Sequence, residues 1–285
     1  MESKRHRFTL IELFVVIVVV GFLFALLFPA LDGGSAKVGR RAQCMNNQRQ
    51  FALALLNYEA KERRFPGYAN RVTKRPDGTW LAGSWVVPLF GYLDRADLES
   101  AWQSGDAVAV GLDFTTCPMH TLKESERRTQ PLLDYVVNCG LPGDADTAAT
   151  GVFHNHNVDS PVYVSLDYLA EHDGAQNTLM LSENLQGGLW TDTQEANVGM
   201  VWLREPDPCS GINQCKDVGQ RPQDIRYARP SSNHRGGVLA TFCDGHIQFI
   251  SHTIDYSVYQ HLMAPCDKDA GLPPGFDRKA IDADP

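Results

Sequence analysis

The sequence predicts an α+β fold in which an N-terminal helical region precedes a body of short strands and turns. Three observations predict this class: an apolar run over residues 8–30, apolar residues at helical spacing over 38–58, and alternating apolar residues around a turn over 237–251. The chain has 285 residues, of which 43% are apolar and 21% charged. This composition excludes a disordered, collagen-like or multi-span membrane protein and allows about two domains.

The net charge of −8 is the difference between two unlike parts of the chain. Residues 1–50 hold seven Lys or Arg against three acidic residues, a net charge of +4, and residues 51–285 hold 19 against 31, a net charge of −12. An acidic body without a basic face argues against a nucleic-acid partner.

The first element is the apolar run over residues 8–30, which only Thr9 and Glu12 interrupt. About twenty helical residues span a hydrocarbon core of roughly 30 Å, so the run predicts a transmembrane helix with the membrane as its partner. A cleaved signal peptide is the alternative, although its apolar region is shorter. Glu12 is unusual, because an ionisable group in such a span is expected either to have a partner or to lie near the interface.

Residues Arg7 to Leu13, with the sequence RFTLIEL, resemble the N-terminal motif of type IV prepilins and pseudopilins. The resemblance implies a cytoplasmic leader over residues 1–7 and a prepilin peptidase that cuts between Arg7 and Phe8 and methylates the new amine. It implies that Glu12 neutralises the amine of a neighbouring subunit during homo- or hetero-assembly. It also implies a single pass through the cytoplasmic membrane, with the N-terminus inside and the body periplasmic or at the cell surface. The family has Gly where this chain has Arg7, and an uncleaved leader would leave Glu12 without that partner.

The next element is a stalk over residues 31–64. Gly33 and Gly34 interrupt the helical pattern, because each Gly costs about 1 kcal/mol relative to Ala in a helix. Helical spacing then resumes over 38–58, and its apolar stripe predicts a helix that lies on a sheet. The remaining segments are a body over 65–264, with a short helix at 95–102 and strands at 135–137, 162–166 and 178–181, and a loose tail over 265–285.

The strongest local pattern is a C-terminal β-hairpin over residues 237–251. Asp244-Gly245 separates its two alternating segments, and this pair favours a two-residue type I′ turn. Such a turn places Phe242 opposite Ile247, which gives the hairpin one apolar face.

His234 and the hairpin turn together form the pattern His234-x9-Asp244-Gly245. The pattern is similar to the C-terminal H-X9-DG signature of a large bacterial family whose members begin with the prepilin motif and whose activity is not established. This resemblance implies a pilin-like fold, with a long N-terminal helix packed on an antiparallel β-sheet and a C-terminal hairpin. Other landmarks of that family occur here in the same order: Gln43-Cys44-x-Asn46-Asn47, Phe65-Pro66, Ser84-Trp85, Thr116-Cys117-Pro118, Asp173-Gly174-x-x-Asn177-Thr178, Glu183 and Ser231-Ser232-Asn233-His234.

Several histidines are candidate metal ligands. His154 and His156 would share one face of a strand, and His234, His246 and Asp244 could converge near the hairpin turn. The chain lacks the HExxH and paired-cysteine spacings of zinc sites. We therefore expect no catalytic metal, and we expect His234 to tie its loop to backbone near the Asp244 turn.

Calcium is the cofactor that the sequence leaves open. Asp173-Gly174 is explained as a turn, with Asn177 and Thr178 capping the entry to a strand. Hard oxygen ligands in loops nevertheless suit calcium, although no EF-hand order is present. The candidate ligands are Asp144, Asp146, Asp173 and Glu183.

Seven cysteines indicate an oxidising compartment. Cys209 and Cys215 are the easiest pair to bridge, because they close a short loop. Cys44 is left over on the stalk and is expected to be a buried small hydrophobic residue. The other pairs considered are Cys117 with Cys139, and Cys243 with Cys266.

The sequence favours a structural function without enzymatic activity. We expect a membrane-anchored, pilin- or pseudopilin-like protein of the cell envelope, as part of a type II secretion or type IV pilus-like assembly. The alternative is a surface-anchored module that binds a glycan, a peptide or calcium. A metal-dependent hydrolase using His154, His156 or His234 is least favoured, because the chain has no nucleophile-elbow, Walker or dinucleotide motif.

Overall fold

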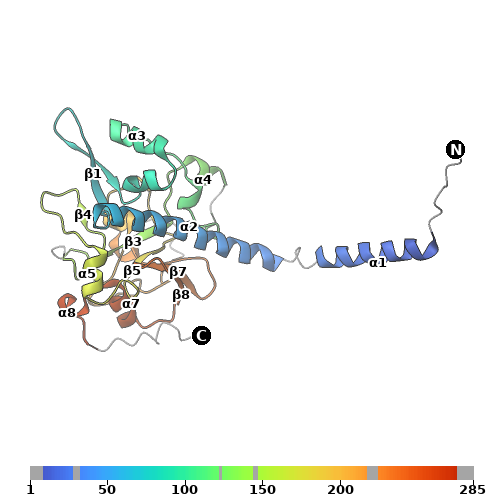
Figure 1. Ribbon diagram of the computed structural model, residues 1–285. Helices are drawn as coiled ribbons and strands as arrows, with labels where there is room; N and C mark the ends of the chain where they lie inside the picture. The colour runs from blue at the N-terminus through green and yellow to red at the C-terminus, as the bar shows by residue number, and fades with distance from the viewer. Residues whose placement is uncertain (1–8, 28–32, 122–123, 144–146, 217–223, 275–285) are drawn as a thin grey trace. The chain divides into compact units, whose positions relative to one another are not determined.

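The structure of the chain is a computed structural model (Figure 1). The chain forms two compact units. The N-terminal unit is Met1–Ala42, and the second unit, the body, is Gln43–Pro285. The residues that the structure describes are 9–27, 33–121, 124–143, 147–216 and 224–274.

The N-terminal unit contains helix α1 (Leu10–Leu27) and the beginning of helix α2 (Gly33–Glu62). α1 begins with a capping box, in which the Thr9 amide donates to the Glu12 carboxylate at 2.8 Å and the Glu12 amide donates to the Thr9 hydroxyl at 3.3 Å. The hydrogen bonds from Thr9 lower the pKa of Glu12. Glu12 therefore has a partner within its own first helical turn.

The predicted membrane span over residues 8–30 is wrong. Within the described residues, no helix is both long enough and apolar enough to cross a membrane. α1 has 18 residues and rises about 27 Å, whereas a hydrocarbon core is roughly 30 Å thick. The expected localisation, a single-pass membrane protein with its N-terminus inside and its body periplasmic or at the cell surface, is corrected by the same finding. The expected processing residues Arg7 and Phe8 lie outside the described part of the chain.

The described strands of the body form two mixed sheets (Figure 1). The smaller sheet has the order β2-β1-β4, in which β1 is antiparallel to β2 and parallel to β4. The larger sheet has the order β6-β3-β5-β7-β8, in which β3 and β6 are parallel and the other neighbours antiparallel. The strands are β1 (Ala69–Lys74), β2 (Trp80–Ser84), β3 (Tyr135–Gly140), β4 (Asn155–His156), β5 (Leu179–Glu183), β6 (Gly199–Val201), β7 (Gly237–Phe242) and β8 (Ile247–Ser251).

Short helices connect these strands. Three elements lie close to their predicted positions: α3 overlaps the helix predicted at 95–102, and β3 and β5 overlap the strands predicted at 135–137 and 178–181. The strand predicted at 162–166 is wrong, because Ser165 accepts a hydrogen bond from the Tyr168 amide at 3.1 Å and begins helix α5. The short helices are η2 (Val87–Tyr92), α3 (Ala96–Ser104), η3 (Asp113–Thr115), α4 (Glu124–Thr129), α5 (Leu166–Glu171), α6 (Glu195–Val198), η4 (Ile225–Tyr227), α7 (Tyr256–Met263) and α8 (Asp267–Ala270).

The α+β class is correct, but the expected pilin-like arrangement of a long N-terminal helix on an antiparallel sheet is wrong. The N-terminal helix α1 is short, and each sheet contains a parallel pair of strands. The parallel pairs were missed because β4 and β6 have two and three residues, too few for a period of two to be visible in the sequence.

The larger sheet is buried on both faces. On one face, Phe51 of α2 packs in the same cluster as Leu239, and its ring centroid lies 4.9 Å from that of Trp85. Gln48 of α2 donates to the Leu239 carbonyl at 2.9 Å, which fixes this part of the helix to β7. The cluster on the other face includes Val136, Leu179, Val238, Phe242 and, from α7, Leu262.

The predicted hairpin of β7 and β8 is present, but its turn and register differ from the prediction. Thr241, not Phe242, lies opposite Ile247. The Gly245 amide donates to the Phe242 carbonyl and the Phe242 amide to the His246 carbonyl, both at 2.9 Å. Gly245 has a φ of +90°. The loop is therefore a three-residue turn ending in a left-handed glycine, which shifts the register by one position.

Candidate functional site

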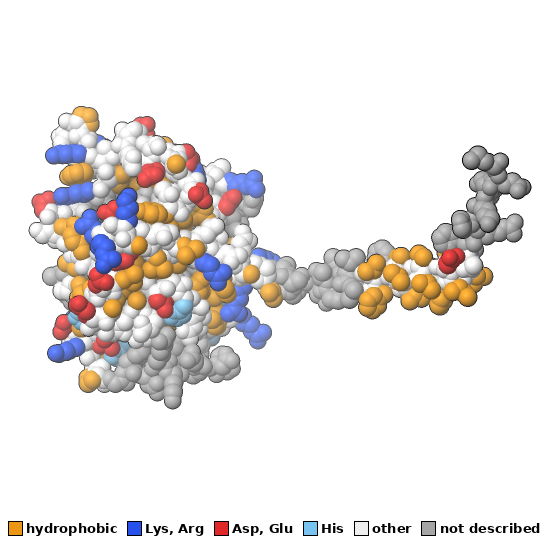
Figure 2. All heavy atoms as spheres, in the orientation of Figure 1, with side chains coloured by type: hydrophobic (Ala, Val, Ile, Leu, Met, Phe, Trp, Pro, Cys, Tyr) orange, Lys and Arg blue, Asp and Glu red, His pale blue; other side chains and the backbone are white. Residues whose placement is uncertain are grey.

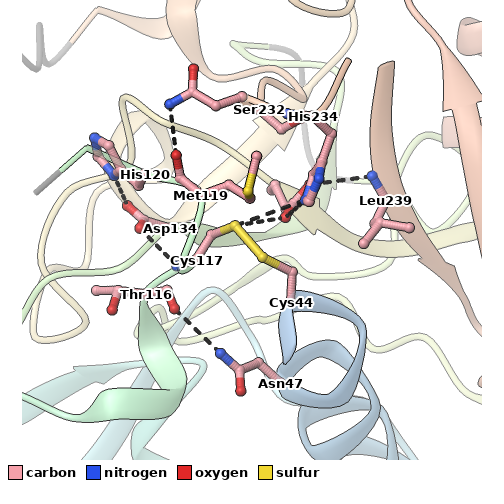
Figure 3. The surroundings of a disulfide bond; sticks show 12 residues. Cys44, Asn47, Thr116, Cys117, Met119, His120, Asp134, Ser232, His234 and Leu239 are labelled. Atoms are coloured by element: carbon pink, nitrogen blue, oxygen red, sulfur yellow. Dashed lines mark hydrogen bonds and ion pairs between the residues drawn. A yellow bond between two sulfur atoms is a disulfide. The ribbon is translucent and has the colours of Figure 1, made fainter. Parts of the chain in front are cut away.

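Four residues from separate parts of the chain meet inside the body, and we call them the buried centre (Figure 3). Cys44 is on α2, Cys117 follows η3, Glu183 ends β5, and His234 lies in the loop before β7. Their exposed fractions are 0, 1, 1 and 5%, respectively. Their sulfur, carboxylate and imidazole atoms all lie within 4.8 Å of one another. The fold thus brings together four of the landmark segments that the sequence presents far apart.

A disulfide between Cys44 and Cys117 joins α2 to the segment before β3 (Figure 3). The bond corrects two expectations, since Cys44 is not left over and Cys117 is not paired with Cys139. The predicted pair of Cys243 and Cys266 is also wrong, because Cys139, Cys243 and Cys266 remain buried thiols. A bridge across 73 positions depends on the tertiary fold, which spacing in the sequence does not reveal.

The imidazole of His234 contacts the carboxylate of Glu183 and not backbone near the Asp244 turn. His234 Nε2 lies 3.0 Å from Glu183 Oε1, and Glu183 Oε2 accepts from the Leu239 amide at 3.2 Å. Burial raises the pKa of Glu183, and this effect exceeds the opposing effect of the His234 hydrogen bond. Cys117 Sγ lies 3.1 Å from Glu183 Oε1 and 3.9 Å from His234 Nε2. The disulfide and the ionisable pair are thus in direct contact.

The loop that carries His234 is fixed by the serines that precede it. Ser232 Oγ accepts from the His234 amide at 3.0 Å and donates to the Gly237 carbonyl at 2.7 Å. The Ser231 amide donates to the Glu183 carbonyl at 2.8 Å. The landmark Ser231-Ser232-Asn233-His234 therefore positions one imidazole against the end of β5.

Asp134 also supports the centre, and it was not among the residues predicted from the sequence. It is fully buried, and one carboxylate oxygen accepts from the Cys117 amide at 2.9 Å while the other lies 2.9 Å from His120 Nδ1 (Figure 3). Asn47 Nδ2 donates to the Thr116 carbonyl at 3.3 Å. A charged residue inside the apolar stretch before β3 was the available signal, because a buried carboxylate requires partners.

The other half of the H-X9-DG pattern lies in the hairpin turn and takes no part in these contacts. Asp244 Oδ1 lies 2.6 Å from His246 Nδ1 and accepts from the His246 amide at 3.0 Å. Asp244 is exposed, and Gly245 supplies the positive φ of the turn. The predicted convergence of His234 with Asp244 and His246 on one metal is therefore not found among the described residues.

The segment from Asp173 to Thr178 forms a turn before β5. Gly174 has a φ of +92°, Asn177 Nδ2 donates to the Asp173 carbonyl at 2.6 Å, and Thr178 Oγ1 donates to the Gly174 carbonyl at 3.2 Å. Asp173 Oδ2 accepts from the Asp267 amide at 2.6 Å. Of the proposed calcium ligands, Asp173 and Glu183 fall in no common group of ligating atoms among the described residues. Asp144 and Asp146 lie outside them.

The remaining histidine candidates contact backbone. His154 Nε2 lies 2.9 Å from the Gly151 carbonyl, and His156 Nε2 lies 3.0 Å from the Val162 carbonyl. In the part of the chain that the structure describes, neither belongs to a group of three or more potential metal ligands.

The predicted disulfide between Cys209 and Cys215 is present. It closes a loop beside Arg229, a fully buried residue that the sequence did not indicate. Arg229 donates to the Gln186 side-chain oxygen at 2.7 Å and to the Gln214 carbonyl. Burial lowers the pKa of Arg229 to about 10.

Burial of the four side chains limits what the buried centre can do chemically. In this structure its four side chains are at most 5% exposed, so a substrate has no access to them. Cysteine, histidine and glutamate side chains are ligands of protein metal sites. Here the two cysteines form a disulfide, which is a crosslink. The arrangement is suited to holding parts of the fold together.

A surface pocket of about 570 Å³ lies elsewhere in the body, between β1, η2, α3 and the loop after β4. Its walls combine aromatic rings with charged groups. Arg64 stacks over the Tyr163 ring at 4.1 Å, and Arg71 forms an ion pair with Asp159 at 2.7 Å. The other lining residues include Tyr58, Asn70, Glu99, Trp102 and His156.

A protein-family model matches most of the chain. A family model described as "Protein of unknown function (DUF1559)" matches residues 36–113 and 139–257, which include three of the four residues of the buried centre. The prepilin-like residues 7–13 lie outside the matched segments. No curated protein and no solved structure matches the chain.

Proposed function

We propose that this chain, which belongs to the DUF1559 family of proteins of unknown function, is a structural assembly protein without enzymatic activity. In this function α1 packs against the α1 helices of further copies, and the body is the part that the assembly displays. The resemblance of residues 7–13 to prepilins supports an assembly of the pilus or secretion type.

The observation that carries this proposal is the apolar surface of α1. Leu10 and Ile11 are 85 and 76% exposed, and the large apolar side chains from Leu13 to Leu23 are 43–65% exposed. Figure 2 shows such side chains on the visible face of α1 over the residues that it colours. A helix that is apolar all round is normally buried, because each large apolar side chain gains about 1.5–3 kcal/mol when it leaves water.

The charge of α1 favours a second α1 as the covering partner. Glu12 is the one ionisable side chain in the described residues 9–27, and its carboxylate already accepts two hydrogen bonds from Thr9. Two or more α1 helices can pack along residues 13–23, which contain no ionisable side chain, without burying this carboxylate.

The mass of the full chain in solution tests this function. We expect the wild type to form oligomers by size-exclusion chromatography with light scattering, and Val18→Asp to be monomeric, because a carboxylate at a buried helix contact is unfavourable. Val158→Asp is the matched control, since Val158 is 39% exposed in the body and should assemble like the wild type. Oligomers of Val18→Asp equal to those of the wild type would contradict the proposal, as would a monomeric wild type.

The pocket favours binding of a glycan as a second function. Aromatic faces such as Tyr163 together with charged and amide groups such as Asn70 and Glu99 are able to stack on a sugar ring and hydrogen-bond its hydroxyls. A glycan array should return specific signals that Tyr163→Ala abolishes. An array at background level with the wild type would rule this function out.

A further inference from the structure

We propose that the buried centre is also a zinc site: a chain that folds with Cys44 and Cys117 reduced binds one Zn²⁺ through their two sulfurs, Glu183 and His234. The disulfide forms instead when an oxidant reaches the two thiols first. This inference goes beyond the assembly function and does not depend on it.

The disulfide alone does not account for the composition of the centre. A crosslink needs no ionisable neighbours, and burying a carboxyl group and an imidazole costs free energy even when they are paired. Glu183 and His234 nevertheless lie fully inside the body, and both approach Cys117 Sγ, at 3.1 and 3.9 Å. A cation between these groups explains why they are gathered at this point.

The distances fit a tetrahedral ion. With Zn–S of about 2.3 Å and Zn–N or Zn–O of about 2.0–2.1 Å, neighbouring ligand atoms of a tetrahedron lie about 3.3–3.8 Å apart. The observed separations are 3.0 Å from His234 Nε2 to Glu183 Oε1, 3.9 Å from His234 Nε2 to Cys117 Sγ, and 3.1 Å from Cys117 Sγ to Glu183 Oε1, each close to this range. Small shifts of these side chains bring them into it, and the two sulfurs, which are bonded in this structure, have to separate furthest.

The donor set selects zinc. Two thiolates, one imidazole and one carboxylate form a closed, four-coordinate set of ligand types that zinc binds, whereas magnesium and calcium take oxygen ligands only. All four positions are supplied by protein, and the centre is buried, so the ion would be structural.

Supporting hydrogen bonds already hold three of the four ligands. The Leu239 amide donates to the second oxygen of Glu183, Ser232 holds the backbone of His234, and Asp134 holds the amide of Cys117. Such partners orient the ligands of metal sites. The pre-orientation exists whether or not the two sulfurs are bonded.

The two outcomes differ in their chemistry. When Zn²⁺ binds, each cysteine thiol loses a proton and forms a Zn–S bond, so that two protons are released and no electrons move. When the disulfide forms, the two thiols lose two protons and two electrons, and a disulfide oxidant accepts the electrons and becomes two thiols. Because the centre is buried, either the zinc site or the disulfide forms while the chain folds.

Metal analysis of the refolded full chain tests the site. The chain is refolded with ZnCl₂ and a thiol reductant, desalted, and analysed for zinc and for free thiols. We expect one zinc per chain, and none in Glu183→Gln or His234→Ala. Refolding with CoCl₂ should give the strong visible absorption of a tetrahedral cobalt–thiolate site in the wild type and not in Glu183→Gln or His234→Ala. The oxidised wild type should hold no zinc, because its two sulfurs are bonded.

Two controls separate loss of the site from loss of the fold or from binding elsewhere. Glu183→Gln and His234→Ala are also prepared oxidised, where circular dichroism shows that the disulfide-linked body folds. Cys266→Ser removes a member of the other group of potential ligands, His172, Cys266 and Asp269, and should keep its zinc. The proposal is overturned if the reduced, folded wild type holds no zinc, if Glu183→Gln holds as much as the wild type, or if Cys266→Ser loses it.

Discussion

Asp134 links the backbone of the buried centre to a second ionisable group. Its two carboxylate oxygens serve two different partners, the Cys117 amide and the His120 ring. We expect Asp134→Asn to lower the free energy of unfolding by about 1–3 kcal/mol, because an amide has one acceptor oxygen and places an NH₂ group where the Cys117 amide or the His120 ring now faces a carboxylate oxygen. Urea denaturation measures the change. Asp106→Asn, at an exposed position, is the control, and equal losses in the two variants would contradict this role.

The capping box of α1 predicts a dependence on pH. The pKa of Glu12 is lowered in the helix from its ordinary value of 4.5, so its stabilising contribution is complete above that value and is lost as the pH falls through the lowered pKa. Cα chemical shifts of residues 10–13 should therefore become less helical as the pH falls below 4.5. Glu12→Gln should show no such change, and a transition of the same size in that variant would exclude Glu12 as its source.

Single residues show how far the candidate site could be predicted. Glu183 and His234 stood in landmark segments of the resemblance and are in the site, but their contact could not be derived from 51 positions of separation. Cys44 was assigned to packing because its partner lies on another element of the fold. Glu12 was expected to need a partner in another subunit, whereas Thr9 supplies one three positions away.

At the scale of elements, the β7–β8 hairpin depends on the conformation of one glycine. Gly245 has a φ of +90°, and a Cβ there would lie 3.0 Å from the side chain of Leu56 on α2. We expect Gly245→Ala to destabilise the body by about 1–2 kcal/mol from the left-handed conformation alone, with a further loss from the contact. Thermal unfolding measures both.

Gly236→Ala separates the two causes of this loss. Gly236 has a similar φ of +88°, and a Cβ there meets nothing within 4 Å. It should therefore show the conformational cost without the contact. An unchanged melting temperature in Gly245→Ala would contradict the three-residue turn.

The same hairpin shows why register was harder to predict than the presence of the element. Asp-Gly suits both two-residue and three-residue loops, so the turn residues alone did not decide between them. Alternation usually decides, because one face is exposed, but both faces of β7 are buried. A slip of one position therefore moved no apolar side chain into water, and the pattern was compatible with either register.

At the scale of the whole molecule, the α+β class followed from composition and periodicity, whereas the sheet topology did not. The parallel pairs involve strands of two and three residues that long connections bring into place. The apolar run at the N-terminus was visible in the sequence, but its length as a helix was not, and that length corrected the membrane prediction. The described part of the body is closed around two clusters and two disulfides, and most of the exposed large apolar side chains among the described residues lie on α1.

The central claim is that α1 of one copy contacts α1 of another, and cysteine crosslinking tests this contact directly. Val18→Cys places a thiol on the exposed helix, and Val158→Cys places one on the body as the control. Under mild oxidation, non-reducing electrophoresis should show covalent dimers of Val18→Cys at concentrations where Val158→Cys stays monomeric. Dimers that form equally in both variants, or in neither, would contradict assembly through α1.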